Sequence, residues 1–430
     1  MVLIQNPKIQ AYIGDICAQI KFREVHQEIQ LEINTHLQES MEEYMAQGFS
    51  EDEAVNKAIV QMGSADTVGK ELNKVHQPKP EWSILSLSLF FAGLGLAAMY
   101  FMGKQGLLLS TQPRIFTKTL VFIIMGAVIV PGLYLFDYRK LEPYSKYLYL
   151  GTLVLMTLTT LVGVPFQGKP YLNIGPFYLD IIGISPFLFS IAFAGLFHKW
   201  QWNEPKKLLQ GFLICLVPLF LILTGRSLST AVIYSIMCLT LMAVSGVKHR
   251  ISLLLFGLLG SITLCSVIST PYRLQRLITF LNPSADPAGS GWLNIQLSQL
   301  MHSSGFFGQG FTLGQKLIPD LHTDFIFSYI TFTFGWIAGG ILVALVVLFM
   351  IRIIFIATTV KNSYGRLLTS GLAAIFAIQF FWNISMNLGW APISEVGLPF
   401  ISFGGSRLIL NAAALGIISS IYRRKNISLT

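Results

Sequence analysis

From residue 82 to residue 422 the chain consists mainly of long apolar runs separated by short polar segments. Most runs are close to 20 residues, which is the length that an α-helix needs to cross the hydrocarbon core of a bilayer. The fourth and fifth runs are the shortest. The pattern predicts about ten transmembrane helices, at 82–102, 116–136, 146–165, 181–197, 208–224, 228–246, 251–270, 325–351, 366–389 and 406–422.

The beginning of the chain follows a different pattern. Ile29, Ile33 and Leu37 recur at helical spacing and indicate an amphipathic helix. Ser50 and Glu53 have the spacing of a capping box, which marks the start of a second helix. A shorter third helix is expected to follow. Such helices, each with one apolar stripe, are typical of a small soluble unit of three to four helices.

We therefore expect an all-α fold: a polytopic membrane protein with about ten transmembrane helices, preceded by a small soluble helical domain. The expected division is a cytoplasmic helical prefix at 1–76, a linker at 77–81 and a transmembrane domain at 82–424. The prefix resembles the helical domain in front of some Gram-positive permeases and sensor proteins. That resemblance implies either a docking or regulatory module or an anchor for folding and topology.

Composition supports this division. Only 12% of the residues are charged, whereas soluble domains average about 25%, so lipid must be the solvent for much of the surface. Residues 1–81 carry 13 of the 21 acidic residues and 7 of the 30 basic ones, which makes the prefix acidic and the rest basic. The net charge of +9 fits contact with membrane lipids. No basic cluster with interleaved aromatic residues indicates a nucleic-acid partner.

Loop charges predict the orientation in the membrane. Lysine and arginine gather in the loops on the side of the N-terminus, which the positive-inside rule assigns to the cytoplasm. Both termini are therefore expected in the cytoplasm, and the long 271–323 loop is expected outside. The basic residues on the cytoplasmic side are Arg139, Lys140, Lys146, Lys199, Lys206, Lys207, Lys248, Arg250, Lys361, Arg366, Arg423, Arg424 and Lys425.

Acid–base chemistry on the outer face has few candidate residues. Of the eight carboxylates after residue 81, five are placed outside or at the outer membrane edge: Asp180, Asp286, Asp320, Asp324 and Glu395. A general acid or base on that face must be one of these or a histidine.

Asp324 is the strongest of these candidates. It ends the stretch Asp320-Leu-His322-Thr323-Asp324, where the polar loop turns into an apolar span whose first turn Thr323 is placed to cap. A carboxylate at such a boundary can be kept dry and basic enough to take a proton from a sugar hydroxyl. By itself the local pattern favours an ordinary first-turn acid. Asp-x-His-x-Asp is also a possible divalent-cation ligand set, although a metal site is the weaker interpretation; no other cofactor is expected.

Two further segments are candidates for binding an anion. Gly404 and Gly405 interrupt an apolar stretch, and non-helical backbone at membrane depth must be buried or line a wet cavity. Beyond them, Ser406 and the next helix start offer free N–H groups, and Arg407 adds a cation, so a phosphate could bind there. The alternative is a plain tight turn between two spans.

Arg273 and Arg276 form the second candidate. They are three residues apart and share a helix face, where they can bind the diphosphate of a lipid substrate. Anchoring to lipid headgroups is the equally common alternative.

Four sequence blocks together resemble the SEDS family (shape, elongation, division and sporulation), the RodA/FtsW/SpoVE proteins. Their order and spacing are more specific than any single block. The resemblance is strongest over about 270–424 and weaker back to about 82. The blocks are Tyr272-Arg273-Leu-Gln-Arg276 with Phe280-Leu-Asn-Pro283, Ser304-Gly305-Phe-Phe-Gly308-Gln-Gly310, His322-Thr323-Asp324-Phe325-Ile-Phe327, and Leu398-Pro399-Phe-Ile-Ser402-Phe403-Gly404-Gly405-Ser406.

The resemblance implies an activity. SEDS proteins are peptidoglycan glycosyltransferases that polymerise lipid II on the outer face of the cytoplasmic membrane, usually beside a class B penicillin-binding protein. Asp324 matches the family's catalytic aspartate and would be the general base of an inverting reaction. The substrate-binding residues would then be Arg273, Arg276, His322, Thr323, Ser402, Gly404, Gly405, Ser406 and Arg407.

Three departures from the family pattern leave other functions open. The family's Pro-Asp-Leu-Gly-Thr stretch is replaced by Gly225-Arg226-Ser-Leu-Ser229-Thr230, its Gln-Pro-Ser-Glu by Tyr178-Leu-Asp180-Ile, and its Glu-Glu-Leu-Gly by Thr331-Phe-Thr333-Phe-Gly335. Several acidic positions are therefore neutral or absent. A specialised member with another partner or substrate fits this pattern, and so does lost activity. The alternatives to a polymerase are a flippase for lipid-linked precursors and a catalytically silent scaffold of the cell-wall machinery.

Overall fold

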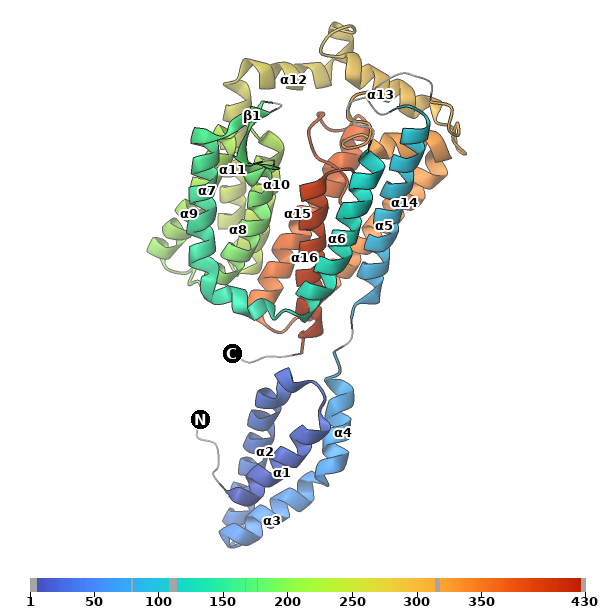
Figure 1. Cartoon of the computed structure of the whole chain (residues 1–430). Coiled ribbons are helices and arrows are strands. Elements are labelled where there is room, and N and C mark those ends of the chain that lie inside the picture. Colours follow the sequence, from blue (N-terminus) through green and yellow to red (C-terminus); the bar gives the residue numbers. More distant parts are fainter. Residues whose placement is uncertain are drawn as a thin grey trace. The chain divides into compact units, whose positions relative to one another are not determined.

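The structure is a computed structural model that describes residues 6–78, 80–107, 114–166, 168–175, 177–313 and 318–426. Lys79, in the expected linker, lies outside these ranges. The chain forms two compact units (Figure 1). The first unit comprises Met1–Pro80, Val360–Asn362 and Arg423–Thr430, and the second comprises Glu81–Thr359 and Ser363–Tyr422.

The first unit is built mainly from four α-helices of the prefix. They are α1 (Pro7–Gln19), α2 (His26–Ala46), α3 (Glu51–Met62) and α4 (Ala65–Val75), with a short 3-10 turn at Arg23–Val25. Ser50 and Glu53 form the predicted capping box at the start of α3. Ile29, Ile33 and Leu37 are buried in one hydrophobic core with residues of α1 and α3. The hydrophobic pattern had located three of these helices and not α1.

The second unit contains ten long apolar helices among its described residues. Eight are long enough to cross a membrane, and α8 and α10 are shorter, with 17 residues each. The fourth predicted span is indeed short, whereas the fifth extends to 20 residues as α9. The ten helices are α5 (Trp82–Lys104), α6 (Ile115–Leu135), α7 (Ser145–Val162), α8 (Ile181–Phe197), α9 (Pro205–Thr224), α10 (Leu228–Val244), α11 (His249–Ile268), α14 (Ile326–Thr359), α15 (Ser363–Asn387) and α16 (Gly405–Arg423).

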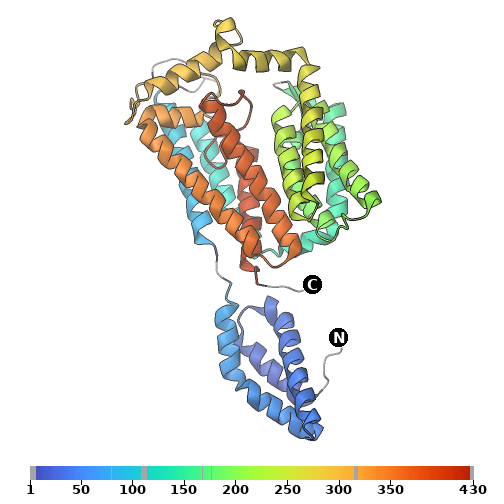
Figure 2. The same cartoon turned by 180° about the vertical axis from the view of Figure 1, so that it is seen from behind.

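These helices form two neighbouring groups, as both Figure 1 and Figure 2 show. One group contains α7 to α11, and the other contains α5, α6, α14, α15 and α16. The groups meet where α15 packs against α8 and α10. The amphipathic helix α12 (Pro271–Leu281) and the helix α13 (Trp292–Ser303) cross over one end of both groups.

A small antiparallel sheet between α7 and α8 was not predicted. Its strands are β1 (Val164–Phe166), β2 (Lys169–Ile174) and β3 (Phe177–Leu179), paired in the order β1-β2-β3. The predicted span 146–165 instead ends at Val162. Short apolar strands and apolar helix ends cannot be told apart by composition, which explains the error. The sheet matters because it brings Lys169 to the functional site.

The long helix α14 is broken at Gly335, where the predicted span was continuous. Gly335 has φ of 89°, in the left-handed region that favours glycine. The glycine-rich segment Ser304–Gly310 pairs with this break, so it satisfies backbone groups that would be costly to leave unpaired at membrane depth. The hydrogen bonds run from Gln309 N to Phe332 O (2.8 Å), Gly310 N to Thr333 O (3.0 Å), Trp336 N to Gly305 O (3.0 Å) and Ile337 N to Phe306 O (3.3 Å).

Candidate functional site

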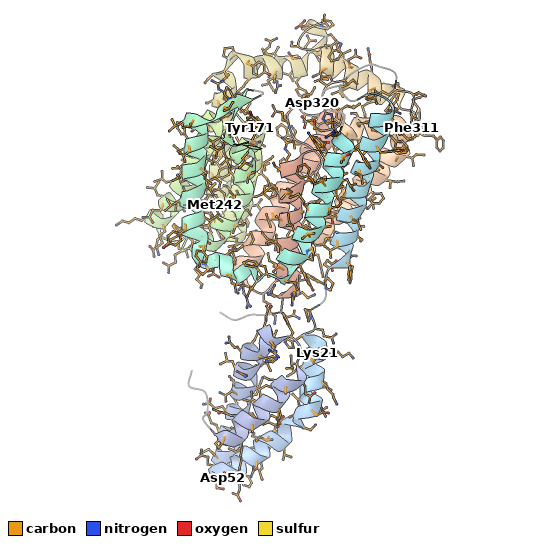
Figure 3. All side chains as sticks on the ribbon, in the orientation of Figure 1. Lys21, Asp52, Tyr171, Met242, Phe311 and Asp320 are labelled. Carbon is orange, nitrogen blue, oxygen red and sulfur yellow. The ribbon has the colours of Figure 1, made fainter. Side chains whose placement is uncertain are left out.

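A cavity of about 1490 Å³ opens in the second unit, and both helix groups contribute to its lining. Tyr171 and Asp320 line it, and Figure 3 shows both at the end of the unit that α12 and α13 cross. All but one of the site residues predicted from the sequence line this cavity: Arg273, Arg276, His322, Thr323, Asp324, Gly404, Gly405, Ser406 and Arg407. The exception, Ser402, lines a smaller neighbouring cavity.

Asp324 lies in a tight turn immediately before α14. Asp320 starts this turn with φ of 56°, a conformation that aspartate tolerates better than most residues. The carbonyl of Asp320 accepts hydrogen bonds from the backbone amides of Thr323, Asp324 and Phe325. The Thr323 hydroxyl donates to the same carbonyl at 3.1 Å, so it stabilises the turn and does not cap α14 as expected.

The Asp324 carboxyl group is buried and incompletely paired. The residue is only 8% exposed, and its Oδ1 has no hydrogen-bond partner. The nearest cation is Arg407, whose Nη1 lies 3.8 Å from Oδ1. Burial raises the pKa of Asp324 from 3.8 to about 7, against the opposing effect of Arg407. A carboxyl group with such a pKa can hold and release a proton near neutral pH.

Two charged residues that sequence reasoning did not connect to Asp324 complete its surroundings. Lys169 on β2 is buried, and its Nζ lies 2.6 Å from Oε2 of Glu395. The backbone carbonyl of Glu395 accepts a hydrogen bond from Arg407 Nη2 at 3.1 Å. Lys169 lowers the pKa of Asp324, whereas Glu395 raises it. Two ion pairs, Lys169–Glu395 and Arg407–Asp324, are thus joined through Arg407.

Two asparagines of α15 hold the backbone of Asp324 in place. Asn383 Nδ2 donates to the Asp324 carbonyl at 2.8 Å and to the Val396 carbonyl at 2.6 Å. Asn387 Nδ2 donates to the Asp324 carbonyl at 3.1 Å, and its Oδ1 accepts from the Ser328 hydroxyl at 2.6 Å. Both asparagines are buried. A sequence signal existed, because two amides four residues apart in an apolar span must find partners on one helix face.

Replacing Asn387 with leucine is expected to destabilise the protein by about 1–3 kcal/mol. The Ser328 hydroxyl would lose its acceptor in a buried site, and the Asp324 carbonyl would lose one of its two donors. Thermal unfolding of the purified protein in detergent measures the change. Asn203→Leu is the matched control, since Asn203 is exposed, and it should change stability by less than about 0.5 kcal/mol. Equal stability of both variants would contradict the assigned role.

The loop before α16 is attached to the turn that carries Asp324. The Phe403 amide donates to the His322 carbonyl at 3.0 Å. The Ser402 hydroxyl donates to the Thr323 carbonyl and accepts from the Leu398 amide. In this arrangement Ser402 positions the loop, whereas we had expected it to bind substrate. Gly405 is required for packing, because an added Cβ would lie 2.3 Å from the Phe122 ring.

His322 and Asp320 do not join Asp324 in a metal site. Among the described residues, no group of three or more His, Cys, Asp or Glu side chains is arranged to hold a metal ion. The His322 ring packs beside Phe403, with ring centroids 5.6 Å apart, and burial lowers its pKa. Burial therefore favours the neutral form of the His322 ring.

The two predicted arginines lie on α12. Arg273 is half-buried and donates to the Leu223 carbonyl at 3.4 Å and to Ser266. The Arg276 guanidinium lies over the Tyr272 ring, 5.0 Å from its centroid. Both line the same cavity as Asp324.

The cell cycle protein family model that covers FtsW, RodA and SpoVE matches residues 82–427. The chain belongs to this family. The match contains all ten apolar helices and every candidate site residue. It begins at residue 82, so the prefix lies outside the matched region.

Named relatives of this FtsW/RodA/SpoVE member are peptidoglycan glycosyltransferases or a sporulation protein. It is 32% identical to a probable peptidoglycan glycosyltransferase FtsW of Coxiella burnetii, covering 80% of this chain and 96% of the relative. It is 26% identical to the peptidoglycan glycosyltransferase RodA of Treponema pallidum (80% and 98%). It is 30% identical to stage V sporulation protein E of Bacillus subtilis (71% and 86%).

Solved structures share the fold of this family member. A chain from a peptidoglycan synthase complex that coordinates polymerization and crosslinking matches with a TM-score of 0.68 and 22% identity, covering 81% of this chain and 98% of that one. The rod shape determining protein RodA of Thermus thermophilus matches with a TM-score of 0.61 and 21% identity, covering 81% and 98%.

The departures from the family pattern occupy defined places in the structure. Thr331 and Thr333 are buried in α14 before the break, so a glutamate at either position would be a buried charge. Asp180 accepts a hydrogen bond from the Gly183 amide at 2.7 Å and caps α8. Arg226 lines the cavity with φ of 59°. The departure at Thr331–Gly335 is thus deep in the bundle, while those at Asp180 and Arg226 reach the cavity.

Proposed function

We propose that this protein is a peptidoglycan glycosyltransferase of the bacterial cytoplasmic membrane that polymerises lipid II into glycan strands on the outer face, for cell shape, division or sporulation. The observation that carries the proposal is the buried Asp324 carboxyl group. It faces a large cavity, has one oxygen without a hydrogen-bond partner and lies 3.8 Å from Arg407. The names of the relatives, which include peptidoglycan glycosyltransferases, support the same activity.

In the proposed reaction, the Asp324 carboxylate takes the proton of the acceptor sugar hydroxyl. The freed oxygen forms a bond to the anomeric carbon of the donor chain. The bond from that carbon to the diphosphate breaks, and its electron pair leaves with the lipid diphosphate, which inverts the configuration. Cations and free backbone amides around the cavity neutralise the leaving group; those proposed are Arg273, Arg276, Arg407 and the Gly404–Ser406 backbone.

The proposed orientation follows from charge and fold together. The basic loops after α6, α8 and α10 lie at the end of the second unit opposite to α12 and α13. The positive-inside rule assigns the basic end to the cytoplasm. We therefore propose that both termini are cytoplasmic and that the cavity opens toward the outer face, where lipid II is used.

A class B penicillin-binding protein is the proposed partner. A polymerase on the outer face yields glycan strands that a second activity must crosslink. The solved relative from a peptidoglycan synthase complex, which coordinates polymerization and crosslinking, supports such a pairing.

Purified protein incubated with lipid II tests the proposed function. Glycan strands should form with the native protein and not with Asp324→Ala. Equal product from both proteins would contradict the mechanism. Translocation of lipid II in vesicles without polymerisation would instead identify a flippase. A protein that shows neither polymerisation nor translocation would be a catalytically silent scaffold. Deleting residues 1–80 separates regulation by the prefix from the chemistry.

The pH dependence of polymerisation should report on Asp324. Activity is expected to fall as the pH drops through about 7, because the general base becomes protonated. Lys169→Met removes a cation that lowers this pKa, so the acid limb should move to higher pH. Glu395→Gln removes an anion that raises the pKa of Asp324, so the acid limb of the profile should move to lower pH. A pH–rate profile of each variant measures the shift.

The double variant Lys169→Met/Glu395→Gln is the control for this pair. It removes both charges, whose effects on Asp324 oppose each other, so its profile should return toward that of the native protein. Single variants that lose activity without any shift along the pH axis would argue against electrostatic control of Asp324.

A further inference from the structure

Three arginines line one part of the large cavity. Arg273 and Arg276 come from α12, and Arg226 comes from the turn between α9 and α10. Burial lowers the pKa of the Arg273 guanidinium, and like-charge repulsion from Arg226 lowers it further, so the two arginines lie close together. Arg226 and Arg276 are exposed to the cavity, and Arg273 is half-buried. Like charges gathered in this way are stabilised by an anion between them.

Among the residues that the structure describes, no acidic side chain supplies that anion. Within the described part of the chain, none of the three guanidinium groups has a carboxylate oxygen within 4.0 Å. The cavity has four carboxylates, and none comes from α9 to α12: they are Asp180 before α8, Asp320 and Asp324 before α14, and Glu395 before α16. Glu395 and Asp324 are already paired with Lys169 and Arg407.

The start of α10 adds a second attraction for an anion. Ser227 is its N-cap residue, but its hydroxyl is engaged with the Thr230 hydroxyl at 2.7 Å and gives no cap to the backbone. The first residues of α10, Leu228 and Ser229, line the cavity beside Arg226. An uncapped helix start carries free amides and a partial positive charge, which together favour phosphate groups.

We propose that Arg226, Arg273, Arg276 and the start of α10 form a binding site for the diphosphate of a polyprenyl-linked substrate, and that Arg226 sets its affinity. The inference deepens the proposed function and rests on it for the identity of the substrate.

Direct binding of undecaprenyl diphosphate to the full-length protein in detergent tests the site without any turnover. Arg226→Ala should weaken binding about 10- to 100-fold, since one charge-assisted contact is lost. Arg226→Asp should weaken it further. Arg250→Ala is the matched control. Arg250 is exposed at the end of α11 that lies away from α12, and it is outside the cavity lining. This variant should therefore bind undecaprenyl diphosphate with unchanged affinity.

Phosphatidylglycerol serves as the second probe, because a lipid monophosphate has similar chemistry. Selective loss of undecaprenyl diphosphate binding in Arg226→Ala supports the site. Equal loss for both lipids identifies a general headgroup contact and overturns the proposal, as does unchanged binding of both. In the polymerisation assay, Arg226→Ala should raise KM for lipid II with little change in kcat. The binding measurement needs no turnover. It therefore tests the diphosphate site even if the protein does not polymerise lipid II.

Discussion

Replacing Asp324 with asparagine is expected to reduce lipid II polymerisation by roughly 100- to 10,000-fold, the range that a positioned general base contributes. Asparagine keeps the shape of the side chain and cannot accept the proton. The turn should remain intact, because it is held by the carbonyl of Asp320 and by the asparagines that bind the Asp324 carbonyl. The initial rate of glycan formation from lipid II is the measurement.

Asp320→Asn is the matched control. It makes the same charge change four residues away, in the same turn and cavity, and Asn accepts a positive φ as readily as Asp does. Its effect should be far smaller than that of Asp324→Asn. If both variants lost activity equally, the turn as a whole would be required, and no special role could be given to Asp324.

Stability should change in the opposite direction. The folded protein raises the pKa of Asp324 from 3.8 to about 7, so it binds this proton more tightly than the unfolded chain does. The contribution of the Asp324 carboxyl group to the free energy of unfolding is therefore fully present below about pH 4 and is lost as the pH rises toward 7. At pH 8, Asp324→Asn should unfold at the same temperature as the native protein or at a higher one. Lower activity with unreduced stability separates chemistry from misfolding.

Replacing Gly335 with alanine is expected to destabilise the second unit by more than about 2 kcal/mol. The backbone conformation at this position, with φ of 89° and ψ of 171°, alone costs about 1–3 kcal/mol for a residue with a Cβ. In addition, the new Cβ would lie 2.1 Å from the Phe306 carbonyl oxygen, so the glycine-rich segment would have to move away. Thermal unfolding in detergent and proteolysis within residues 304–313 should both report the change.

Gly340→Ala is the control in the same helix. Nothing lies within 4 Å of a Cβ added at this position, and alanine is favoured over glycine inside a helix by roughly 0.5–1 kcal/mol. This variant should therefore be as stable as the native protein or more stable. Equal destabilisation by both substitutions would mean that the break at Gly335 is not a fixed feature of the fold.

Much of the fold could be predicted, because membrane helices depend on a simple physical rule. Apolar runs of about 20 residues located all ten helices. The rule failed where length and composition carry no information. The three strands at 164–179 are too short to be recognised, and the break in α14 depends on pairing with Ser304–Gly310, which lies 25 to 31 residues before Gly335. Run length alone cannot reveal either feature.

The site was predictable in part for a related reason. Asp324 and Arg407 stood out because charges are rare near apolar spans, and the structure brings them within 3.8 Å. Lys169 and Glu395 carry the same kind of signal, but their partnership joins residues far apart in the chain. The amides Asn383 and Asn387 act through hydrogen bonds to a backbone carbonyl, a role that no local pattern encodes.

The break in α14 also has a consequence for distance. A straight helix of 34 residues would measure about 51 Å, well beyond the roughly 30 Å of a bilayer core. Because the helix changes direction at Gly335, the short segment before it can bring Asp324 inward to α15 and to Arg407. The number of residues between Gly335 and Asp324 therefore determines both how far the carboxylate reaches and which way it points, since each residue turns a helix by about 100°.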